Sequence, residues 1–303
     1  VNEGKGTFGV RLAPLESVVY RVGRRDIVRY NEFESQFVDP RNVDVWLPHG
    51  YDGSDDRYSV LYMHDGQNLF IPFQSVYSGV DWGVDETLQR LIDDGRARNT
   101  IVVGIWSTPK RRLEYLPQEA WDAAPEQMQV YIEDNEGGMP GSREYLRFIV
   151  DELKPFIDSN YRTRPGRDDT FLMGSSMGGI ISLYGVIRFP DVFGGAACVS
   201  THWPSTMMPD NPEGNAPFLD FLRGSIPAPG AHRIYFDFGT AELDAQYEPH
   251  QQQVDAVMRE LGYEPGLLWQ TRRFEGAGHN EGAWSARVHI PLTFLLGKNN
   301  NKE

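Results

Sequence analysis

Apolar runs and helix-period stretches alternate along most of this chain. Short runs rich in Val, Ile, Leu and aromatic residues predict buried strands, and they fall at residues 42–47, 58–63, 100–105, 170–173, 195–199, 233–238 and 268–274. Stretches with apolar residues at spacings of three and four predict helices, and they fall at residues 84–92, 143–160, 179–188, 248–261 and 283–296. This alternation is typical of βαβ units, so we predict an α/β fold with a largely parallel sheet and helices on both faces. The runs around residues 27–47 have no helix between them, and we expect them to pair antiparallel at one edge.

The stretch at residues 110–141 does not follow the alternation. It is rich in acidic residues, Pro and Gly, and it is longer than an ordinary connection. Two interpretations stay open: an insertion that covers a site at the exit edge of the sheet, or a solvated excursion. One domain spanning residues 1–303 accounts for the rest, with ends that we expect to fray at about residues 1–10 and 298–303.

Composition narrows the range of partners. The 303 residues carry a formal net charge of −14, which argues against nucleic acid or an anionic membrane surface as partner. No run approaches ~20 consecutive apolar residues, so no membrane span is predicted. The single cysteine, Cys198, excludes an intrachain disulfide and is expected to be a buried thiol. The chain begins at Val1 without a Met or a leader, which favours a secreted or periplasmic form after signal removal over a cytoplasmic one, a shortened chain being the alternative.

The segment FLMGSSMGGI, residues 171–180, joins a predicted strand to a predicted helix through a G-x-S-x-G pattern. Counted from Gly174 to Gly178, the middle residue is Ser176, with Ser175 as its neighbour. Such a turn strains the serine backbone, and the two glycines let strand and helix approach each other. The pattern alone is weak, but the strand before it and the helix after it favour a nucleophile over a structural turn. The amide of Met177 would then donate to an oxyanion.

A serine nucleophile needs a base and an acid that orients the base. His279 lies in the Gly-rich loop FEGAGHNEGAW between the last predicted strand and helix, which is where the base is expected. The acid is expected in the loop GTAELDAQYEP, where Asp244 is our choice and Glu242 is the alternative. Asp237 lies inside the preceding strand and is a poor candidate.

The loop HDGQNLF, which follows the strand at residues 58–63, is expected to supply a second oxyanion donor. The amide of Gly66 or of Gln67 is the candidate, while His64 is expected to be structural. Neither an H-E-x-x-H motif nor a Cys/His pairing at ligand spacing occurs, so we expect no metal and no cofactor.

Aromatic residues follow several of these loops and are candidates for binding substrate. Rings at the rim of such a site suit a flat aromatic acid or a sugar ring, and packing of the helices is the alternative for each tryptophan. The candidates are His202, Trp203, Trp82 and Trp284.

Five stretches resemble the esterase branch of the α/β hydrolases, which includes enterochelin, feruloyl and acetyl esterases, S-formylglutathione hydrolases and mycolyltransferases. They are YSVLYMHDGQNLF, YLRFIVDELKPFIDSNYRT, TFLMGSSMGGIISLYGVIRFPDVFGGAACVS, IYFDFGTAELDAQYEPHQQQVD and GAGHNEGAWSARVHIPLTFLLG, and they span about residues 43–297. The resemblance implies the α/β-hydrolase fold, with Ser176 as nucleophile and His279 as base. It implies Asp244 as acid in relatives with a GT-x-x-LDA-x-Y loop, and a position nearer Glu242 in feruloyl esterases. The usual His-Gly turn is one residue longer here, at His64, Asp65 and Gly66.

The residues and the resemblance together predict a serine carboxylesterase that works through an acyl-enzyme. The expected substrate is a small-molecule or carbohydrate ester: an acylated sugar, an aromatic ester or a siderophore-type ester. An acyltransferase on the same scaffold and a non-catalytic binding relative are the alternatives, although a full set of catalytic candidates disfavours the second.

Overall fold

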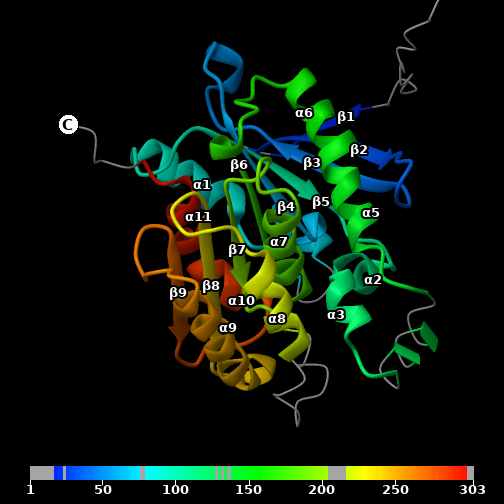
Figure 1. The fold of residues 1–303 in the computed structure, drawn as a ribbon. Coiled ribbons are helices and arrows are strands. Elements are labelled where there is room, and N and C mark those ends of the chain that lie inside the picture. The colour runs from blue at the N-terminus through cyan, green and yellow to red at the C-terminus, as the bar shows by residue number, and fades with distance from the viewer. Residues whose placement is uncertain are drawn as a thin grey trace, which may run out of the picture.

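The computed structural model describes residues 17–22, 25–75, 79–126, 129–130, 133–134, 138–203 and 216–298, which fold around one nine-stranded sheet (Figure 1). The strand order is β1-β2-β3-β5-β4-β6-β7-β8-β9. The strands are β1 Ser17–Val22, β2 Arg25–Phe33, β3 Arg41–Trp46, β4 Ser59–His64, β5 Thr100–Ile105, β6 Thr170–Ser175, β7 Gly195–Val199, β8 Arg233–Gly239 and β9 Trp269–Phe274. The first three pairs in this order, β1–β2, β2–β3 and β3–β5, are antiparallel. The remaining pairs, from β5–β4 to β8–β9, are parallel. The predicted parallel sheet with an antiparallel N-terminal edge is confirmed.

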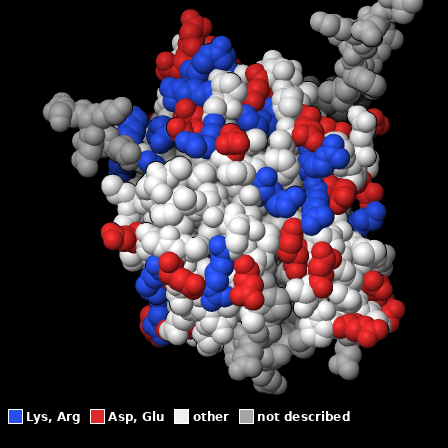
Figure 2. Space-filling view, in the orientation of Figure 1, with Lys and Arg blue, Asp and Glu red and all other residues white. Residues whose placement is uncertain are grey.

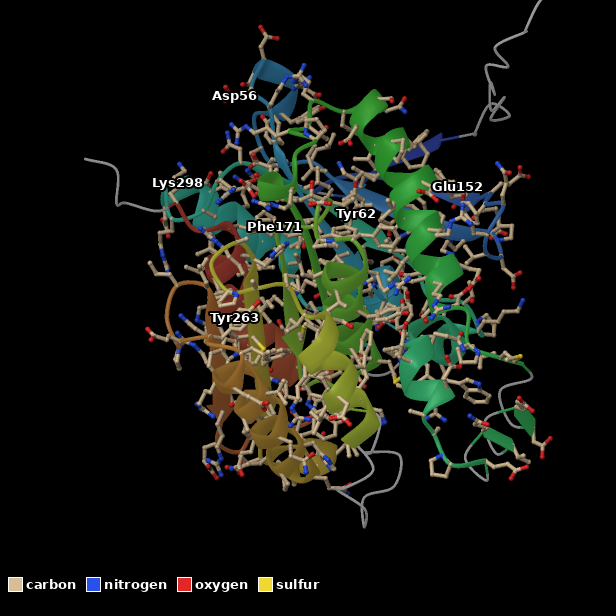
Figure 3. All side chains as sticks on the ribbon, viewed as in Figure 1. Asp56, Tyr62, Glu152, Phe171, Tyr263 and Lys298 are labelled. Atoms are coloured by element: carbon tan, nitrogen blue, oxygen red, sulfur yellow. The ribbon has the colours of Figure 1, made fainter. Side chains whose placement is uncertain are left out.

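Side chains of the central strands alternate between two apolar layers, as the period of two in a strand requires. In β4, Val60 and Tyr62 face one layer, and Leu61 and Met63 face the other. Tyr62 and Phe171 belong to opposite layers, and both lie in the interior of the molecule in Figure 3. Both faces of the central strands are therefore buried, which is why these strands read as continuous apolar runs.

Helices cover both faces of the sheet. One face carries α1 (Val84–Asp93), α10 (Glu281–Arg287) and α11 (His289–Leu296), whose apolar side chains belong to the same layer as Leu61 and Met63. The other layer is larger, and the helices that contribute to it are α2 (Arg111–Tyr115), α3 (Gln118–Asp122), α5 (Ser142–Arg147), α6 (Lys154–Asn160), α7 (Met177–Arg188), α8 (Ala216–Ser225) and α9 (Glu248–Glu260). A π-helical turn, Phe148–Leu153, joins α5 to α6.

The structure differs from the sequence prediction in a few elements. The single helix expected at residues 283–296 is two helices that meet at Val288. Pro291 has no amide hydrogen to donate to the carbonyl of Arg287, so a continuous helix would lack a bond there. The strand β1 and the helix α8 were not predicted. The ends expected to fray lie outside the described residues, apart from Lys298.

The described part of residues 110–141 packs on the domain. Leu113, Tyr115 and Trp121 of its helices α2 and α3 are buried in the larger apolar layer. Glu114 forms a buried ion pair with Arg41 of β3, at 2.7 Å between Nη2 and Oε1. A solvated excursion therefore does not describe the two helices.

Three expectations from composition concern the surface charge, the single thiol and membrane spans. On the face in Figure 2, acidic and basic side chains are interspersed, so the net negative charge does not gather there in one patch. Cys198 on β7 is free and fully buried, and burial raises the pKa of its thiol. Within the described ranges, none of the helices combines the length and apolarity that crossing a membrane demands.

Candidate active site

Ser176 occupies the tip of a strand–turn–helix unit, between the last residue of β6 and the first of α7. Its backbone has φ 57° and ψ −124°, the strained conformation expected of a serine at such a turn. A Cβ on Gly174 would lie 2.7 Å from the carbonyl oxygen of Gly178, so strand and helix approach too closely for a side chain there. The backbone amide of Ser176 donates to Val199 O at 2.9 Å, which fixes the turn to the end of β7. Ser176 is partly exposed, whereas Ser175 is buried.

His279 and Asp244 meet at this edge of the sheet. His279 lies in the loop between β9 and α10, and its Nδ1 is 2.6 Å from Oδ1 of Asp244 in the short helix Glu242–Gln246 that follows β8. Asp244 has no exposed surface. Burial would raise the pKa of Asp244, but hydrogen bonds from His279, Ser200 and the Gly239 amide outweigh it and hold that pKa below its usual range. A carboxylate in this position fixes the tautomer in which Nδ1 carries the proton and leaves Nε2 as the base.

Glu242, the alternative acid, contacts the backbone of the histidine loop instead of the imidazole. Its Oε2 accepts from the amide of His279 at 3.0 Å and from Nδ2 of Asn280 at 3.1 Å. A Cβ on Gly278 would lie 2.5 Å from the Glu242 carboxylate, so this glycine lets the loop close over it. Glu242 therefore shapes the loop that carries His279.

Tyr247, which follows the short helix of Asp244, was not predicted from the sequence. Its hydroxyl lies 2.8 Å from Nδ1 of His202 and close to the Ser176 side chain. Its ring stands edge-on to that of His279, with centroids 5.5 Å apart. Burial raises the pKa of Tyr247, so the phenol keeps its proton. The Tyr in the motif LDA-x-Y was the available signal, and only the fold shows that it faces the serine.

His202 is the one predicted aromatic contact that lies beside the nucleophile. Its amide donates to the Ser176 carbonyl oxygen at 3.1 Å. Burial lowers the pKa of His202 to about 3, assisted by the charges of His279, Arg112 and Arg111. The imidazole is therefore neutral at neutral pH.

The three tryptophans pack in the interior and do not line a rim, which corrects the expectation for them. Trp203 is 1% exposed and its Nε1 donates to Gln251 at 3.3 Å. Trp82 and Trp284 pack against each other with centroids 5.4 Å apart. Trp284 also stands edge-on to His279, with centroids 5.0 Å apart. An indole that follows a functional loop in sequence can point into the core just as well as into the site.

The candidate oxyanion donors come from two neighbouring turns. Met177 is the first residue of α7, and Gly66 and Gln67 begin the one-turn helix Gly66–Asn68, so these amides have no acceptor within their own turns. The side chain of Gln67 is bonded to Ser107, at 2.7 Å from Nε2 to Oγ, which leaves the main chain as its candidate donor. A Cβ on Gly178 would lie 3.4 Å from Asp65 and from His64, so the two turns are adjacent.

Two features hold the turn at Gly66 in place. Asp65 has a left-handed backbone, with φ 58°. Arg111 of α2 donates two hydrogen bonds to the Asp65 carboxylate, at 2.6 and 2.8 Å. His64 is buried, and its Nδ1 lies 2.8 Å from the hydroxyl of Tyr145. Burial lowers the pKa of His64 to about 3, as suits a neutral structural side chain. The helix α2 of the inserted stretch thus supports the turn that carries the candidate oxyanion donors.

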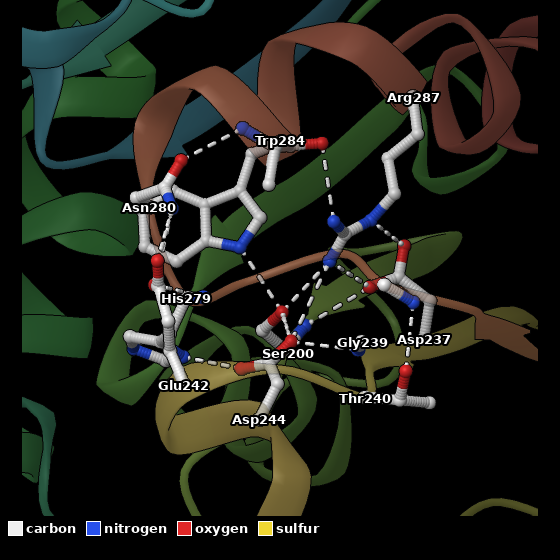
Figure 4. Close-up of polar contacts among 12 residues, drawn as sticks. Ser200, Asp237, Gly239, Thr240, Glu242, Asp244, His279, Asn280, Trp284 and Arg287 are labelled. Atoms are coloured by element: carbon white, nitrogen blue, oxygen red, sulfur yellow. Dashed lines mark hydrogen bonds and ion pairs between the residues drawn. The ribbon is translucent and has the colours of Figure 1, made fainter.

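Behind Asp244 lies a buried polar network, drawn in Figure 4. Ser200, at the end of β7 with φ 43°, donates from Oγ to Oδ2 of Asp244 at 2.5 Å. Arg287 of α10 bonds both Ser200 and Asp237, with Nη2 at 2.7 Å from Oγ and 3.0 Å from Oδ1. From the sequence, Asp237 was a poor candidate for the acid, and neither Ser200 nor Arg287 was a candidate, because no local pattern links these three positions. Among the described residues, no cluster of three His, Cys, Asp or Glu side chains is arranged to hold a metal.

One family model and several known proteins resemble this chain. The family described as "Putative esterase" matches residues 35–290. An uncharacterized protein, YbbA of Bacillus subtilis, is 24% identical over 270 residues, which cover 86% of this chain and 94% of that protein. An endo-1,4-beta-xylanase/feruloyl esterase of Xylanibacter ruminicola is 26% identical over 172 residues, which cover 51% of this chain and 18% of that protein. The solved structure of a ferric enterobactin esterase from Salmonella typhimurium has a TM-score of 0.66 at 17% identity, over 91% of this chain and 59% of that one. The chain thus spans nearly all of the Bacillus protein and less than two thirds of the other two.

Proposed function

This chain belongs to the esterase family whose model it matches, and on that premise we propose that it hydrolyses carboxylic esters through an acyl-enzyme on Ser176. The ester hydrolysis rests on the family, and the serine mechanism rests on the site. The observation that carries the mechanism is the 2.6 Å contact between His279 and the buried carboxylate of Asp244, at the sheet edge where the strained Ser176 turn lies.

In the first half of the reaction, Nε2 of His279 takes the proton of the Ser176 hydroxyl while Oγ attacks the ester carbonyl carbon. The carbonyl oxygen becomes an oxyanion, which the amide of Met177 and that of Gly66 or Gln67 stabilise. The tetrahedral intermediate collapses, the bond to the alcohol oxygen breaks, and His279 returns its proton to that oxygen. Asp244 keeps its negative charge throughout and stabilises the imidazolium.

In the second half, water replaces the alcohol. His279 takes a proton from the water as its oxygen attacks the acyl carbon, and the bond to Oγ then breaks. The proton passes from His279 to Oγ, so the acid leaves and Ser176 is restored. Each proton that His279 accepts is returned within the same half-reaction, and no cofactor is needed.

We propose three classes of ester as the first substrates to examine: acylated sugars, aromatic esters and siderophore-type esters. The support is the similarity to one protein named as a feruloyl esterase and to another named as an enterobactin esterase. His202, which is partly exposed beside Ser176 and bonded to the buried Tyr247, offers a polar contact to a hydroxyl group of such a substrate.

The test is intact-mass analysis after treatment with a fluorophosphonate, followed by peptide mapping of the adduct. We expect one adduct on Ser176 in the wild type and none in Ser176→Ala. Ser175→Ala is the matched control and should keep the adduct, because its side chain is buried beside the reactive turn. Absence of any adduct on the folded wild type, or an adduct that maps elsewhere, would contradict the proposal.

A further inference from the structure

The second carboxylate oxygen of Asp244, Oδ2, does not face His279 but a buried polar network. This Oδ2 accepts from the Ser200 hydroxyl at 2.5 Å and from the Gly239 amide at 2.7 Å. Both donors are buried together with the carboxylate. Two donors on one oxygen fix the carboxylate plane, and so the direction in which Oδ1 points toward His279.

The Ser200 hydroxyl is fully used, so the position of its proton follows from its neighbours. Its Oγ accepts from Nη2 of Arg287 at 2.7 Å and from Nε1 of Trp284 at 3.0 Å. A hydroxyl has two lone pairs and one hydrogen. With both lone pairs occupied, the hydrogen is directed to Asp244.

Arg287 places one cation between two carboxylates. Its side chain is 5% exposed, and Nη2 lies 3.0 Å from Oδ1 of Asp237 and 3.8 Å from Oδ2 of Asp244. Asp237 also accepts from the Ser200 amide at 3.1 Å and from the Tyr235 hydroxyl at 3.0 Å. These donors on Asp237 fit a carboxylate that carries no proton. The buried group beyond Asp244 is therefore an ion pair whose two charges nearly cancel.

We propose that the anion of Asp237 offsets the cation of Arg287 beside Asp244, with Ser200 as the relay between them, so that either charge alone would shift the pH range in which His279 can act as the base. The three are positioning residues, since none of them touches the reacting atoms. The cation of Arg287 opposes the gain of a proton by His279, and the anion of Asp237 offsets that effect. The inference rests on the proposed role of His279 and deepens it.

Other groups also face His279, and the test must hold them constant. Asp244 bonds the ring, Glu242 bonds its backbone amide, and the rings of Tyr247 and Trp284 stand edge-on to it. His202 also lies near His279, whose charge helps to lower the pKa of His202. The variants below leave all five of these residues unchanged.

Asp237→Asn removes the anion and leaves the guanidinium uncompensated. The midpoint of the acidic limb of kcat/KM should move down by about one pH unit, the order expected when one nearby buried charge is removed. Arg287→Gln should move the midpoint up by a similar amount. The double variant removes both charges, so its midpoint should return close to the wild-type value. Tyr235→Phe is the matched control, because it removes a neutral hydrogen bond from the same network and should leave the midpoint in place.

The titration of His279 itself is then followed by NMR in a Ser176→Ala background, which needs no turnover. Opposite shifts in the two single variants would support the inference even if no ester substrate were known. Equal midpoints in folded single variants would overturn it, while leaving the proposed function intact. If the wild-type protein formed no fluorophosphonate adduct on Ser176, that result would instead contradict the proposed function.

Ser200→Ala keeps the test decisive if the buried charge variants do not fold. Without its hydroxyl, Asp244 loses one of the two donors that fix its plane. We expect kcat to fall roughly tenfold with KM unchanged, because a less firmly held Asp244 orients His279 less well in the transition state. A folded Ser200→Ala protein with wild-type kcat would overturn the relay.

Discussion

Asp244→Asn is the substitution whose consequence the structure determines most closely. An Asn amide has one acceptor oxygen and one donor NH₂ group, and the two ends of Asp244 face different neighbours. One end meets the amide of Gly239 at 2.7 Å and the hydroxyl of Ser200 at 2.5 Å, and the other meets Nδ1 of His279 at 2.6 Å. A backbone amide can only donate, so the Asn oxygen must take the Gly239 side. The NH₂ group is then directed at His279.

An NH₂ group facing Nδ1 forces the wrong tautomer on the imidazole. Nδ1 must accept, so Nε2 carries the proton and cannot take one from Ser176. Serine hydrolases with this exchange lose about 10⁴-fold in kcat, equivalent to about 5 kcal/mol of activation free energy. We expect a loss of that order, with KM little affected, because Asp244 is buried behind His279 and away from substrate.

The assay is steady-state hydrolysis of a chromogenic ester, with folding checked by thermal unfolding. Glu242→Gln is the matched control: Gln keeps an oxygen that can accept from the His279 amide, so we expect less than about tenfold loss. A folded Asp244→Asn enzyme that is no weaker than Glu242→Gln would refute the reasoning. A larger loss in Glu242→Gln would transfer the acid role to Glu242.

Three further predictions test other parts of the site. Burial lowers the pKa of His64 to about 3 in the folded protein, so below about pH 6.5 only the unfolded chain gains the proton, and the free energy of unfolding falls as the pH drops. Between pH 7 and pH 4.5, we expect the free energy of urea unfolding to fall by roughly 2 to 3 kcal/mol less in His64→Gln than in the wild type. Equal decreases in the two proteins would contradict this. A Cβ on Gly66 would lie 2.5 Å from the carbonyl carbon of Gly104, so Gly66→Ala should displace the oxyanion turn. The loss of one oxyanion donor should lower kcat about 10²-fold or more in steady-state kinetics, and unchanged kcat would exclude this turn as a donor. Tyr247→Phe removes the 2.8 Å contact with His202, and we expect roughly a fivefold to tenfold fall in kcat/KM by steady-state kinetics, whereas wild-type kinetics would make the contact incidental.

The fold was largely predictable because its strands are buried on both faces. The apolar runs at 100–105 and 195–199 coincide with β5 and β7, since polar or glycine-rich segments delimit both. The strand β1, Ser17–Val22, lies at the sheet edge and lacks that strong signal. The boundary between α10 and α11 arises because Pro291 has no amide hydrogen to donate. The spacing of apolar residues continues across this position, so it does not reveal the boundary.

The site was predictable only where the chain order itself carries the chemistry. Ser176 stands at a strand–helix turn and His279 in a glycine-rich loop, so local sequence singled out both as candidates. The choice of Asp244 over Glu242 depended on which carboxylate faces the ring, and both lie on the same short helix. Ser200 and Arg287 lie 87 positions apart and meet only in the folded protein. Long-range polar contacts of this kind have no signature in a single sequence.

The lone thiol of Cys198 offers a direct way to watch this site open. It is fully buried on β7, and a Cβ on Gly179 at the start of α7 would lie 3.4 Å from its Cα. A buried, protonated thiol does not react, so alkylation must wait until the layer between β7 and α7 separates. Because the sequence contains no second cysteine, the mass added by a thiol reagent counts those opening events without background. The rate of labelling would therefore report how often the layer that holds Ser176 opens. Comparing this rate between variants would show which substitutions destabilise that layer.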